Sequence, residues 1–160
     1  MEIRFAKPQD TQGILALLRQ VGQVHHLGRP DIFRDKAQKY SASQVLAMMN
    51  VPDTPIFVAV EQDQVLGYGF CMVKVYEKDP VIADHSTLYI DDLCVDENHR
   101  GQHIGKAIYQ HIVAYAKRRK CHNVTLNVWS CNPGAMKFYE SLGLKPQKVG
   151  METLLEDNEC

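Results

Sequence analysis

The sequence lacks a strong excess of charge of either sign. Its 160 residues include 18 Lys and Arg against 19 Asp and Glu, which gives a formal net charge of −1. Proteins that bind nucleic acid usually carry a basic excess, and disordered chains combine high net charge with few apolar residues. Here 45% of the residues are hydrophobic. The composition therefore argues against both classes and predicts one folded domain over residues 1–160.

Long apolar runs and paired cysteines are also missing. No stretch approaches the roughly 20 apolar residues that a membrane-spanning helix needs. The residues from Met1 to Lys7 alternate charged and apolar side chains, without the apolar region of a signal peptide. The five cysteines are odd in number and form no Cys-x-x-Cys pair, which disfavours a disulfide framework. We therefore expect a cytoplasmic protein that has no membrane partner.

Strand-like and helix-like segments alternate along the chain. The strand patterns cover residues 2–7, 56–60, 65–75, 87–95 and 124–128, and the residues from 144 onward are again extended. Helical spacing of apolar residues follows at 8–21, 43–49, 104–120 and 132–142. The stretch 22–39 shows no clear period and is predicted to be a loop or broken helices. This order predicts an α+β (mixed α/β) domain.

The most informative segment is Val95–Lys106, which passes from a strand through a polar turn into an amphipathic helix. Gly101 and Gly105 would let a ligand approach the backbone, and Arg100 and Lys106 add positive charge. The N–H groups of a first helical turn lack intrahelical partners, and the helix dipole adds partial positive charge there. The segment therefore suits phosphate or pyrophosphate. An ordinary strand-to-helix turn would use the same glycines.

Two common phosphate-binding motifs do not fit this segment. A Walker A loop needs glycines that are five positions apart and a Ser or Thr after the lysine, whereas Gly101 and Gly105 are only four apart and Ala107 follows Lys106. A dinucleotide-binding fingerprint needs three glycines in an N-terminal βαβ unit. ATP hydrolysis and dinucleotide chemistry are therefore disfavoured.

Two motifs resemble the GNAT superfamily of acetyl-CoA-dependent N-acetyltransferases. The residues Arg100-Gly101-Gln102-His103-Ile104-Gly105 resemble its pyrophosphate loop, Arg/Gln-x-x-Gly-x-Gly/Ala, with His103 where glycine is most frequent. The segment 132–144, NPGAMKFYESLGL, resembles its Asn-x-x-Ala-x-x-Phe-Tyr-x-x-Leu-Gly-Phe segment. The likeness covers residues 55–152. It implies the GNAT acyltransferase fold, a twisted, mixed, mostly antiparallel sheet with helices on both faces.

The resemblance also implies where acetyl-CoA would bind. The strand residues Leu93, Cys94 and Val95 would pair with the pantetheine arm, in a slot between the strands that end at Val95 and Val128. The main chain near Leu93 would polarise the thioester carbonyl. Asn132 matches a position that contacts the cofactor arm, and it could equally be only a helix N-cap. Backbone amides would hold the diphosphate at Arg100, Gly101, Gln102, His103, Ile104, Gly105 and Lys106.

Tyr139 matches the residue that protonates the departing coenzyme A thiolate in this family. A phenol with a pKa of about 10 suits that role because the pKa of the thiolate is comparable. The alternative is a core role, because Tyr139 shares one helix face with Phe138 and Leu142.

Asp91 and Asp92 are the candidates for receiving the proton of the amine. An alkylammonium must lose a proton before it attacks a thioester, and polyamine acetyltransferases of the family carry a Glu-Asp pair at this point. Alignment places Asp91 at the glutamate, one methylene shorter, which implies a water relay. Successive strand residues point to opposite faces, so without a bulge only one carboxylate can face the cleft. Both could instead be solvated strand carboxylates.

Two further groups of residues complete the candidate list. His25 and His26 lie where the family builds its acceptor site, so they are candidates for substrate contact, although such a pair is often only an exposed polar loop. Cys94, His99 and His103 do not have the spacing of a tetrahedral metal site. We therefore expect no metal.

The predicted function is direct transfer of an acetyl group from acetyl-CoA to a primary amine. A cationic small molecule is favoured because acidic residues crowd the site, namely Asp84, Asp91, Asp92, Asp96 and Glu97. A protein N-terminus or lysine side chain is the alternative acceptor. An acyl-CoA sensor without turnover is the alternative of another class. The family often forms homodimers through its last strands, so a homodimer is expected.

Overall fold

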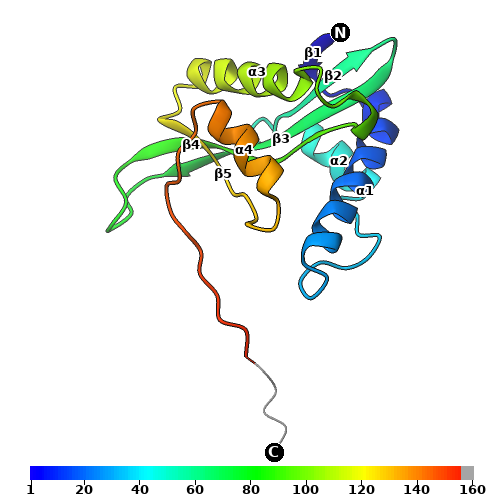
Figure 1. The fold of residues 1–160 in the computed structure, drawn as a ribbon. Helices are drawn as coiled ribbons and strands as arrows, with labels where there is room; N and C mark the ends of the chain where they lie inside the picture. The colour runs from blue at the N-terminus through cyan, green and yellow to red at the C-terminus, as the bar shows by residue number, and fades with distance from the viewer. Residues whose placement is uncertain (156–160) are drawn as a thin grey trace, which may run out of the picture.

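A five-stranded sheet in the order β1-β2-β3-β4-β5 lies at the centre of the computed structural model, which describes residues 1–155 (Figure 1). The first four strands pair antiparallel, and β4 pairs parallel with β5. This arrangement confirms the mixed, mostly antiparallel sheet. The strands are β1 Glu2–Phe5, β2 Ile56–Glu61, β3 Gln64–Tyr76, β4 His85–Val95 and β5 Asn123–Leu126.

Helices cover both faces of this sheet, as predicted (Figure 1). On one face α1 and α2 enclose a core that includes Leu18, Tyr68 and Phe70. On the other face α3 encloses a core around Leu88 and Ile108. None of the helices in residues 1–155 is long and apolar enough to cross a membrane. The helices are η1 Pro8–Asp10, α1 Thr11–Gly28, α2 Ala42–Met49, η2 Glu97–His99, α3 Ile104–Arg118 and α4 Pro133–Ser141.

The helix α1 corrects the prediction of a loop or broken helices from residue 22. It continues to Gly28, and the Arg29 N–H donates to the His25 carbonyl at 2.9 Å. Its last turns face a loop rather than the sheet: a Cβ on Gly22 would come within 2.3 Å of the Ala37 carbonyl oxygen. A helix end that packs against a loop needs no regular apolar stripe, so the sequence shows no helical period there.

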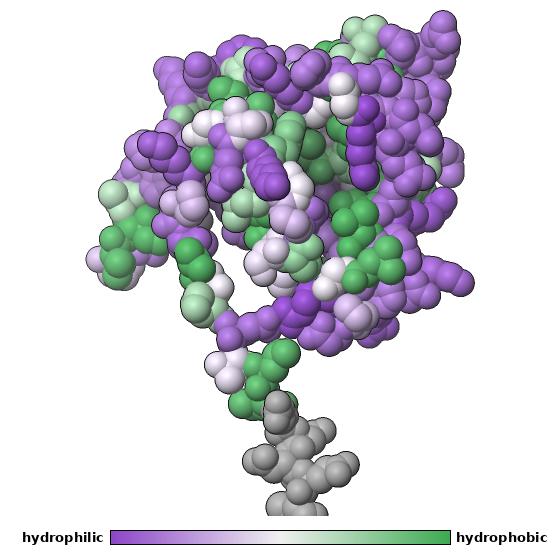
Figure 2. Space-filling view, viewed as in Figure 1, coloured by the Kyte–Doolittle hydropathy of each residue, from purple (hydrophilic) through white to green (hydrophobic). Residues whose placement is uncertain are grey.

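The residues after α4 correct a second prediction. Gly143 takes a φ of +91° and ends the helix, as expected of a C-cap glycine. The chain then continues in an extended form, but no residue from 144 to 155 pairs with a strand of the described chain. Residues 145–155 are all exposed, and Figure 2 shows apolar side chains on this segment standing clear of the body.

Candidate active site

The strand β4 changes direction at Asp91 through a β-bulge. Ile90 lies opposite Cys71 and Asp92 lies opposite Phe70, which leaves Asp91 as an extra residue without a partner on β3. An extra residue reverses the alternation of side chains along a strand. Ile90 belongs to the core under α3, whereas Cys94 belongs to the core under α1. The bulge therefore lets both carboxylates reach the α1 side, which a regular strand would not allow.

The same bulge reverses the direction of the backbone hydrogen-bonding groups. The Asp96 N–H donates to the Leu66 carbonyl on β3 at 2.8 Å. Because these directions alternate along a strand, the N–H groups of Leu93 and Val95 point away from β3. On that side the pairing with β5 ends at Ile90 opposite Leu126. Within residues 1–155, the edge from 91 to 95 therefore has no strand partner.

Cys94 differs from its two neighbours on this edge. The alternation directs its N–H toward β3, and its buried thiol lies 3.8 Å from the Leu17 carbonyl. Burial raises the pKa of this thiol to about 12. Of the three strand residues predicted to bind the cofactor, Cys94 is thus the one that the geometry turns away. The partner strand β5 ends at Leu126 rather than at the predicted Val128.

The loop between β4 and α3 presents free backbone donors. No N–H group from residue 101 to residue 106 has a protein acceptor within residues 1–155. Gly101 and His103 both adopt left-handed backbone conformations, with φ of +78° and +60°. Glycine adopts such a conformation without strain, which explains why it is frequent at the position of His103 in the GNAT superfamily that this loop resembles. Arg100 and Lys106 are exposed at the same loop.

Gly105 allows close packing of two helices. A Cβ at this position would lie 3.1 Å from the Phe138 ring. The residue is buried at the start of α3, so its missing side chain lets α4 approach α3. The two glycines of the motif therefore have different roles, because Gly101 has open space around its missing Cβ. Figure 2 shows apolar surface in a hollow on the face of the molecule that carries α4.

Asp91 is held by the loop that joins α1 to α2. The Tyr40 hydroxyl donates to its Oδ2 at 2.5 Å, and the Lys39 Nζ lies 2.9 Å from the same oxygen. The Lys39 Nζ also donates to the main-chain oxygen of Asp91 at 3.3 Å. The carboxylate thus binds one alkylammonium and one phenol, both more than 50 residues away in the sequence.

Asp92 and Tyr139 share a second cluster. The Tyr68 hydroxyl donates to Asp92 Oδ2 at 2.8 Å. Burial raises the pKa of Asp92, opposed by that hydrogen bond and by the positive charge of Lys39. Burial also raises the pKa of Tyr139, and the nearby negative charge of Asp92 raises it further. The structure therefore brings Tyr139 from α4 close to Asp92 and keeps its phenol protonated.

The two histidines lie in the last turn of α1 rather than in a loop. The His25 ring stacks on Phe33 with centroids 4.9 Å apart, and Phe33 meets Trp129 edge-on at the same distance. A charge on His25 lowers the pKa of Asp92, so this ring lies near the carboxylates. His26 Nδ1 lies 2.7 Å from the Phe33 carbonyl oxygen. His25 thus borders the site, whereas His26 holds the loop.

Asn132 acts as the N-cap of α4. Its Oδ1 accepts a hydrogen bond from the Ala135 N–H at 3.2 Å. This contact bears out the N-cap interpretation, and the amide nitrogen has no hydrogen-bond partner within residues 1–155. In that part of the chain, no three His, Cys, Asp or Glu side chains form a group that could hold a metal ion.

Sequence reasoning missed Lys39, Tyr40, Tyr68 and the aromatic pair Phe33–Trp129. Lys39 and Tyr40 end a stretch without a helical or strand period, so no pattern marks them. Tyr68 alternates regularly with its neighbours on β3 and is indistinguishable in the sequence from other core residues. Only the register between β3 and β4 could have linked Tyr68 to Asp92, because the bulge decides which residues of the two strands lie opposite each other.

Comparison with known proteins gives a consistent result. The sequence model of the acetyltransferase (GNAT) family matches residues 22–144. The thialysine N-epsilon-acetyltransferase of Bos taurus is 26% identical over 144 residues, covering 88% of this chain and 82% of that protein. The peptidyl-lysine N-acetyltransferase YjaB of Salmonella typhimurium is 25% identical over 146 residues, covering 91% and 83%.

A solved structure agrees with these relatives. A single-residue mutant of the BH1408 protein from Bacillus halodurans superposes with a TM-score of 0.93 at 33% identity, covering 98% of this chain and 100% of that chain. The fold and enzyme class predicted from the two motifs are thereby confirmed. The chain belongs to the acetyltransferase (GNAT) family and is an acetyl-CoA-dependent N-acetyltransferase.

Proposed function

We propose that this enzyme transfers an acetyl group directly from acetyl-CoA to a cationic small molecule that carries a primary amine. The observation that carries the proposal is the placement of Asp91. Its carboxylate lies at the bulge where the free edge of β4 begins, and it already binds an alkylammonium, that of Lys39, at 2.9 Å. An acceptor amine of the same chemistry would meet the carboxylate beside the edge where the thioester lies.

The residues of the free edge and the adjoining loop fit acetyl-CoA. The amides of the pantetheine arm would pair with the outward N–H groups of Leu93 and Val95. The Leu93 N–H would also polarise the thioester carbonyl, in the manner of an oxyanion-hole donor. The free N–H groups of residues 101–106 and the charges of Arg100 and Lys106 suit the diphosphate. The free amide nitrogen of Asn132, at the N-terminal end of α4, would contact the cofactor arm.

Proton transfer would involve groups on both sides of the thioester. The ammonium of the acceptor would pass a proton to Asp91, directly or through water, and the free amine would attack the carbonyl carbon. Tyr139 would then donate its phenolic proton to the departing thiolate. The raised pKa of Tyr139 keeps the phenol protonated until the thiolate forms, so that a proton is available at this point. Burial is the main cause of the raised pKa of Tyr139, and the negative charge of Asp92, which is bound to Tyr68, adds to it.

The relatives support an amine acceptor of two kinds. One relative is named for thialysine, and another for lysine side chains of proteins. Both names describe a primary amine on an alkyl chain, which is the group that Asp91 binds in Lys39. The small molecule remains our first proposal because the packed rings of His25, Phe33 and Trp129 would form an aromatic wall for it, with His25 near Asp92. A protein lysine or N-terminus is the second candidate.

A sensor that binds acyl-CoA without turnover is the competing proposal. Its support is the left-handed His103 in the loop and the short Asp91 side chain. The presence of a protonated Tyr139 beside Asp92 argues against it, since a binding domain needs no acid at that point.

The deciding experiment is a thiol-release assay with acetyl-CoA and a panel of polyamines, aminoglycosides, amino acids and lysine peptides. We expect release with one class of cationic amine, and a loss in kcat of about 100-fold or more in Tyr139→Phe. Asp91→Asn is expected to lose about 100-fold as well. Tyr76→Phe, at the far end of β3, is the matched control and should keep full activity. Tight acetyl-CoA binding without release for any amine would favour the sensor.

We also propose that the enzyme is a homodimer in which the C-terminal segments are exchanged. The outer edge of β5 pairs with no strand of residues 1–155. The segment 145–155 alternates side chains in the manner of a strand, and Val149, Met151 and Leu155 are 75%, 89% and 91% exposed. Its one side-chain anchor in the described chain is the ion pair between Glu152 and Arg29. A second copy would supply the missing partner for both the edge and the segment.

Light scattering coupled to gel filtration tests the dimer. The full chain should have twice the monomer mass, and a chain that ends at Gly143 should have the mass of one copy. The matched control is a Glu152→Gln variant, which removes the ion pair but keeps the alternating side chains, and it should stay dimeric. A full-length chain that remains monomeric at high concentration would contradict the proposal.

A further inference from the structure

Lys39 is the charged group of the site that the proposed reaction does not use. Asp91 supplies both oxygen atoms that its Nζ contacts within residues 1–155, the carboxylate oxygen at 2.9 Å and the main-chain oxygen at 3.3 Å. The side chain is 45% exposed, whereas that of Asp91 is 11% exposed. A partly exposed lysine thus reaches inward to a sheltered carboxylate. Lys39 occupies the position that the acceptor ammonium is proposed to take.

Nothing in the fold requires a lysine at this position. The Tyr40 hydroxyl already donates to the same Asp91 oxygen at 2.5 Å. Tyr40 is also packed against Phe70, with ring centroids 5.2 Å apart, so the loop is held by an aromatic contact. A salt bridge with one exposed partner contributes little to stability. The ammonium of Lys39 therefore matters for what Asp91 can bind rather than for the fold.

We propose that Lys39 is an acceptor built into the enzyme: the chain acetylates its own Lys39. The inference rests on the proposed function, because it uses the same acetyl donor, carboxylate and acid. It makes Lys39 a modification site, and the acetylation of Lys39 would regulate the binding of substrates at the acceptor site. Unmodified Lys39 competes with cationic substrates for Asp91, and acetylated Lys39 does not.

The chemistry balances without any further reactant. The Lys39 ammonium gives one proton to Asp91 or its water, and the neutral nitrogen attacks the carbonyl carbon of acetyl-CoA. The new C–N bond forms, the C–S bond breaks, and the thiolate takes a proton from Tyr139. The second proton of the nitrogen is lost as the amide forms, and solvent restores the phenol. The products are N-acetyl-lysine and free coenzyme A.

The reach of the side chain permits this attack. The Leu93 N–H, proposed to hold the thioester oxygen, is two residues from Asp91, which is roughly 7 Å along a strand. Lys39 has four rotatable side-chain bonds, and in the described chain its Nζ contacts the oxygens of Asp91 and lies 5.7 Å from the centroid of the Tyr40 ring. Rotation about those bonds moves the Nζ over several ångströms without any change in the loop backbone. Because Lys39 and the active site belong to the same chain, no separate acceptor molecule has to bind to the enzyme, and this favours acetylation of Lys39.

Acetylation would change the acceptor site by removing one charge. An amide nitrogen carries no positive charge and cannot form an ion pair with Asp91. The carboxylate would then be free to bind an incoming ammonium. We therefore expect the modified enzyme to bind cationic acceptors more tightly than the unmodified enzyme does.

The test is mass spectrometry of the full-length protein after incubation with acetyl-CoA and no added amine. We expect a gain of one acetyl group, located on Lys39 by peptide mapping, at a rate at least roughly tenfold above that of any other lysine. The rate should not depend on protein concentration, because the reaction occurs within one chain. Lys39→Arg should remove the label, and Tyr139→Phe should slow it in proportion to its effect on turnover.

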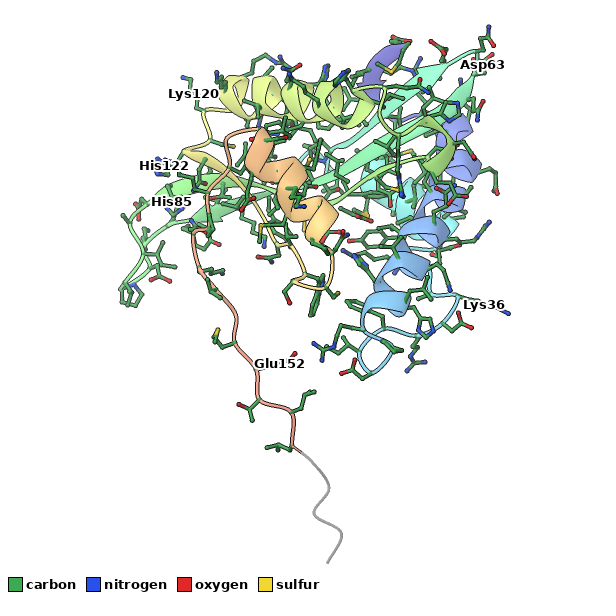
Figure 3. The ribbon with its side chains drawn as sticks, viewed as in Figure 1. Lys36, Asp63, His85, Lys120, His122 and Glu152 are labelled. Carbon is green, nitrogen blue, oxygen red and sulfur yellow. The ribbon has the colours of Figure 1, made fainter. Side chains whose placement is uncertain are left out.

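Lys36→Arg is the matched control in the same loop. Figure 3 shows the Lys36 side chain directed outward from the loop, away from the body of the molecule. This variant should be labelled on Lys39 as fast as the wild type. Equal labelling of Lys36 and Lys39, or no label on Lys39 in a preparation that acetylates an added amine, would overturn the inference and leave the proposed function intact. If neither Lys39 nor any amine is acetylated, the proposed function fails with it.

A kinetic measurement tests the regulatory half. Lys39→Gln imitates the acetylated state, and we expect it to lower the KM for cationic acceptors by roughly two- to fivefold with kcat unchanged. Lys39→Arg keeps the competing charge and should keep the KM of the unmodified enzyme. An unchanged KM in Lys39→Gln would overturn the claim that Lys39 competes for Asp91.

Discussion

The two halves of β4 differ in what surrounds them. From His85 to Ile90 the strand pairs with β3 on one side and, over its last four residues, with β5 on the other. From Asp92 to Val95 it pairs with β3 alone. The bulge at Asp91 separates the halves and exchanges which groups face the core and which face the open edge. One strand thus pairs on both sides in its first half and has an edge without a strand partner, within the described residues, in its second.

The second half keeps its position without a second strand because α3 packs directly over it. On β3 the residues opposite Leu93 and Val95 are Gly69 and Gly67. A Cβ on either glycine would lie within 3 Å of an α3 isoleucine, 2.7 Å on Gly69 and 2.9 Å on Gly67. The helix therefore lies close against the sheet at this point. The comparison teaches that a helix packed on the sheet can support an edge that no second strand covers.

The largest expected effect concerns the paired half. Leu88 is fully buried under α3, so Leu88→Ala leaves a cavity and should lower the free energy of unfolding by about 2–5 kcal/mol. Leu93→Ala, in the open half, removes a side chain that is only half-buried, and should cost about 1 kcal/mol. Urea denaturation of both variants measures the difference. Because Leu93→Ala keeps the outward N–H, its turnover should remain within a few-fold of the wild type.

Equal losses of stability in the two variants would break the comparison. They would mean that the open half contributes to the core as much as the paired half. A large loss of turnover in Leu88→Ala, measured per folded molecule, would also contradict it, because the residue is separated from the site by the bulge.

The difference between the halves also separates what could be predicted from the sequence and what could not. The loop that follows β4 and the start of α4 are local features, in which strand, turn and helix are adjacent in the chain. Their residues could therefore be identified from the motifs at 100–105 and 132–144. The fold class followed from the same likeness.

The bulge and the residues that bind Asp91 could not be predicted because they depend on pairing between distant segments. Neither Asp91 nor Asp92 differs from a regular strand residue until the register with Phe70 and Cys71 is known. Lys39 is 52 residues from Asp91, in a loop whose path depends on the packing of α1. The detached segment after Gly143 is extended, as its strand pattern predicts, but its partner does not lie in the described chain.

The next effect in size concerns the loop that continues the open half. Gly101 has a φ of +78° and open space around its missing Cβ, so Gly101→Ala is disfavoured by conformation alone, by about 1–2 kcal/mol. The strain should appear in the binding of acetyl-CoA, since the loop carries the free N–H groups. Calorimetry should show a dissociation constant raised by about tenfold. Gly150→Ala, also in open space but without a positive φ, is the matched control and should bind normally.

The smallest effect sharpens the comparison, because it should make the open half more stable and less active. Burial raises the pKa of Asp92 above its unfolded value of about 3.9. A carboxyl whose pKa is raised on folding stabilises the fold while it is protonated, and this contribution is lost as the pH rises from about 3.9 through the folded pKa. At neutral pH the buried charge therefore costs stability. Asp92→Asn should raise the free energy of unfolding at pH 7 by about 1 kcal/mol, with the gain shrinking toward about pH 3. Turnover should fall in the same variant, because one of the two negative charges that would attract a cationic acceptor is gone. A variant less stable than the wild type at pH 7 would show that the carboxylate holds the open half together instead of serving its chemistry.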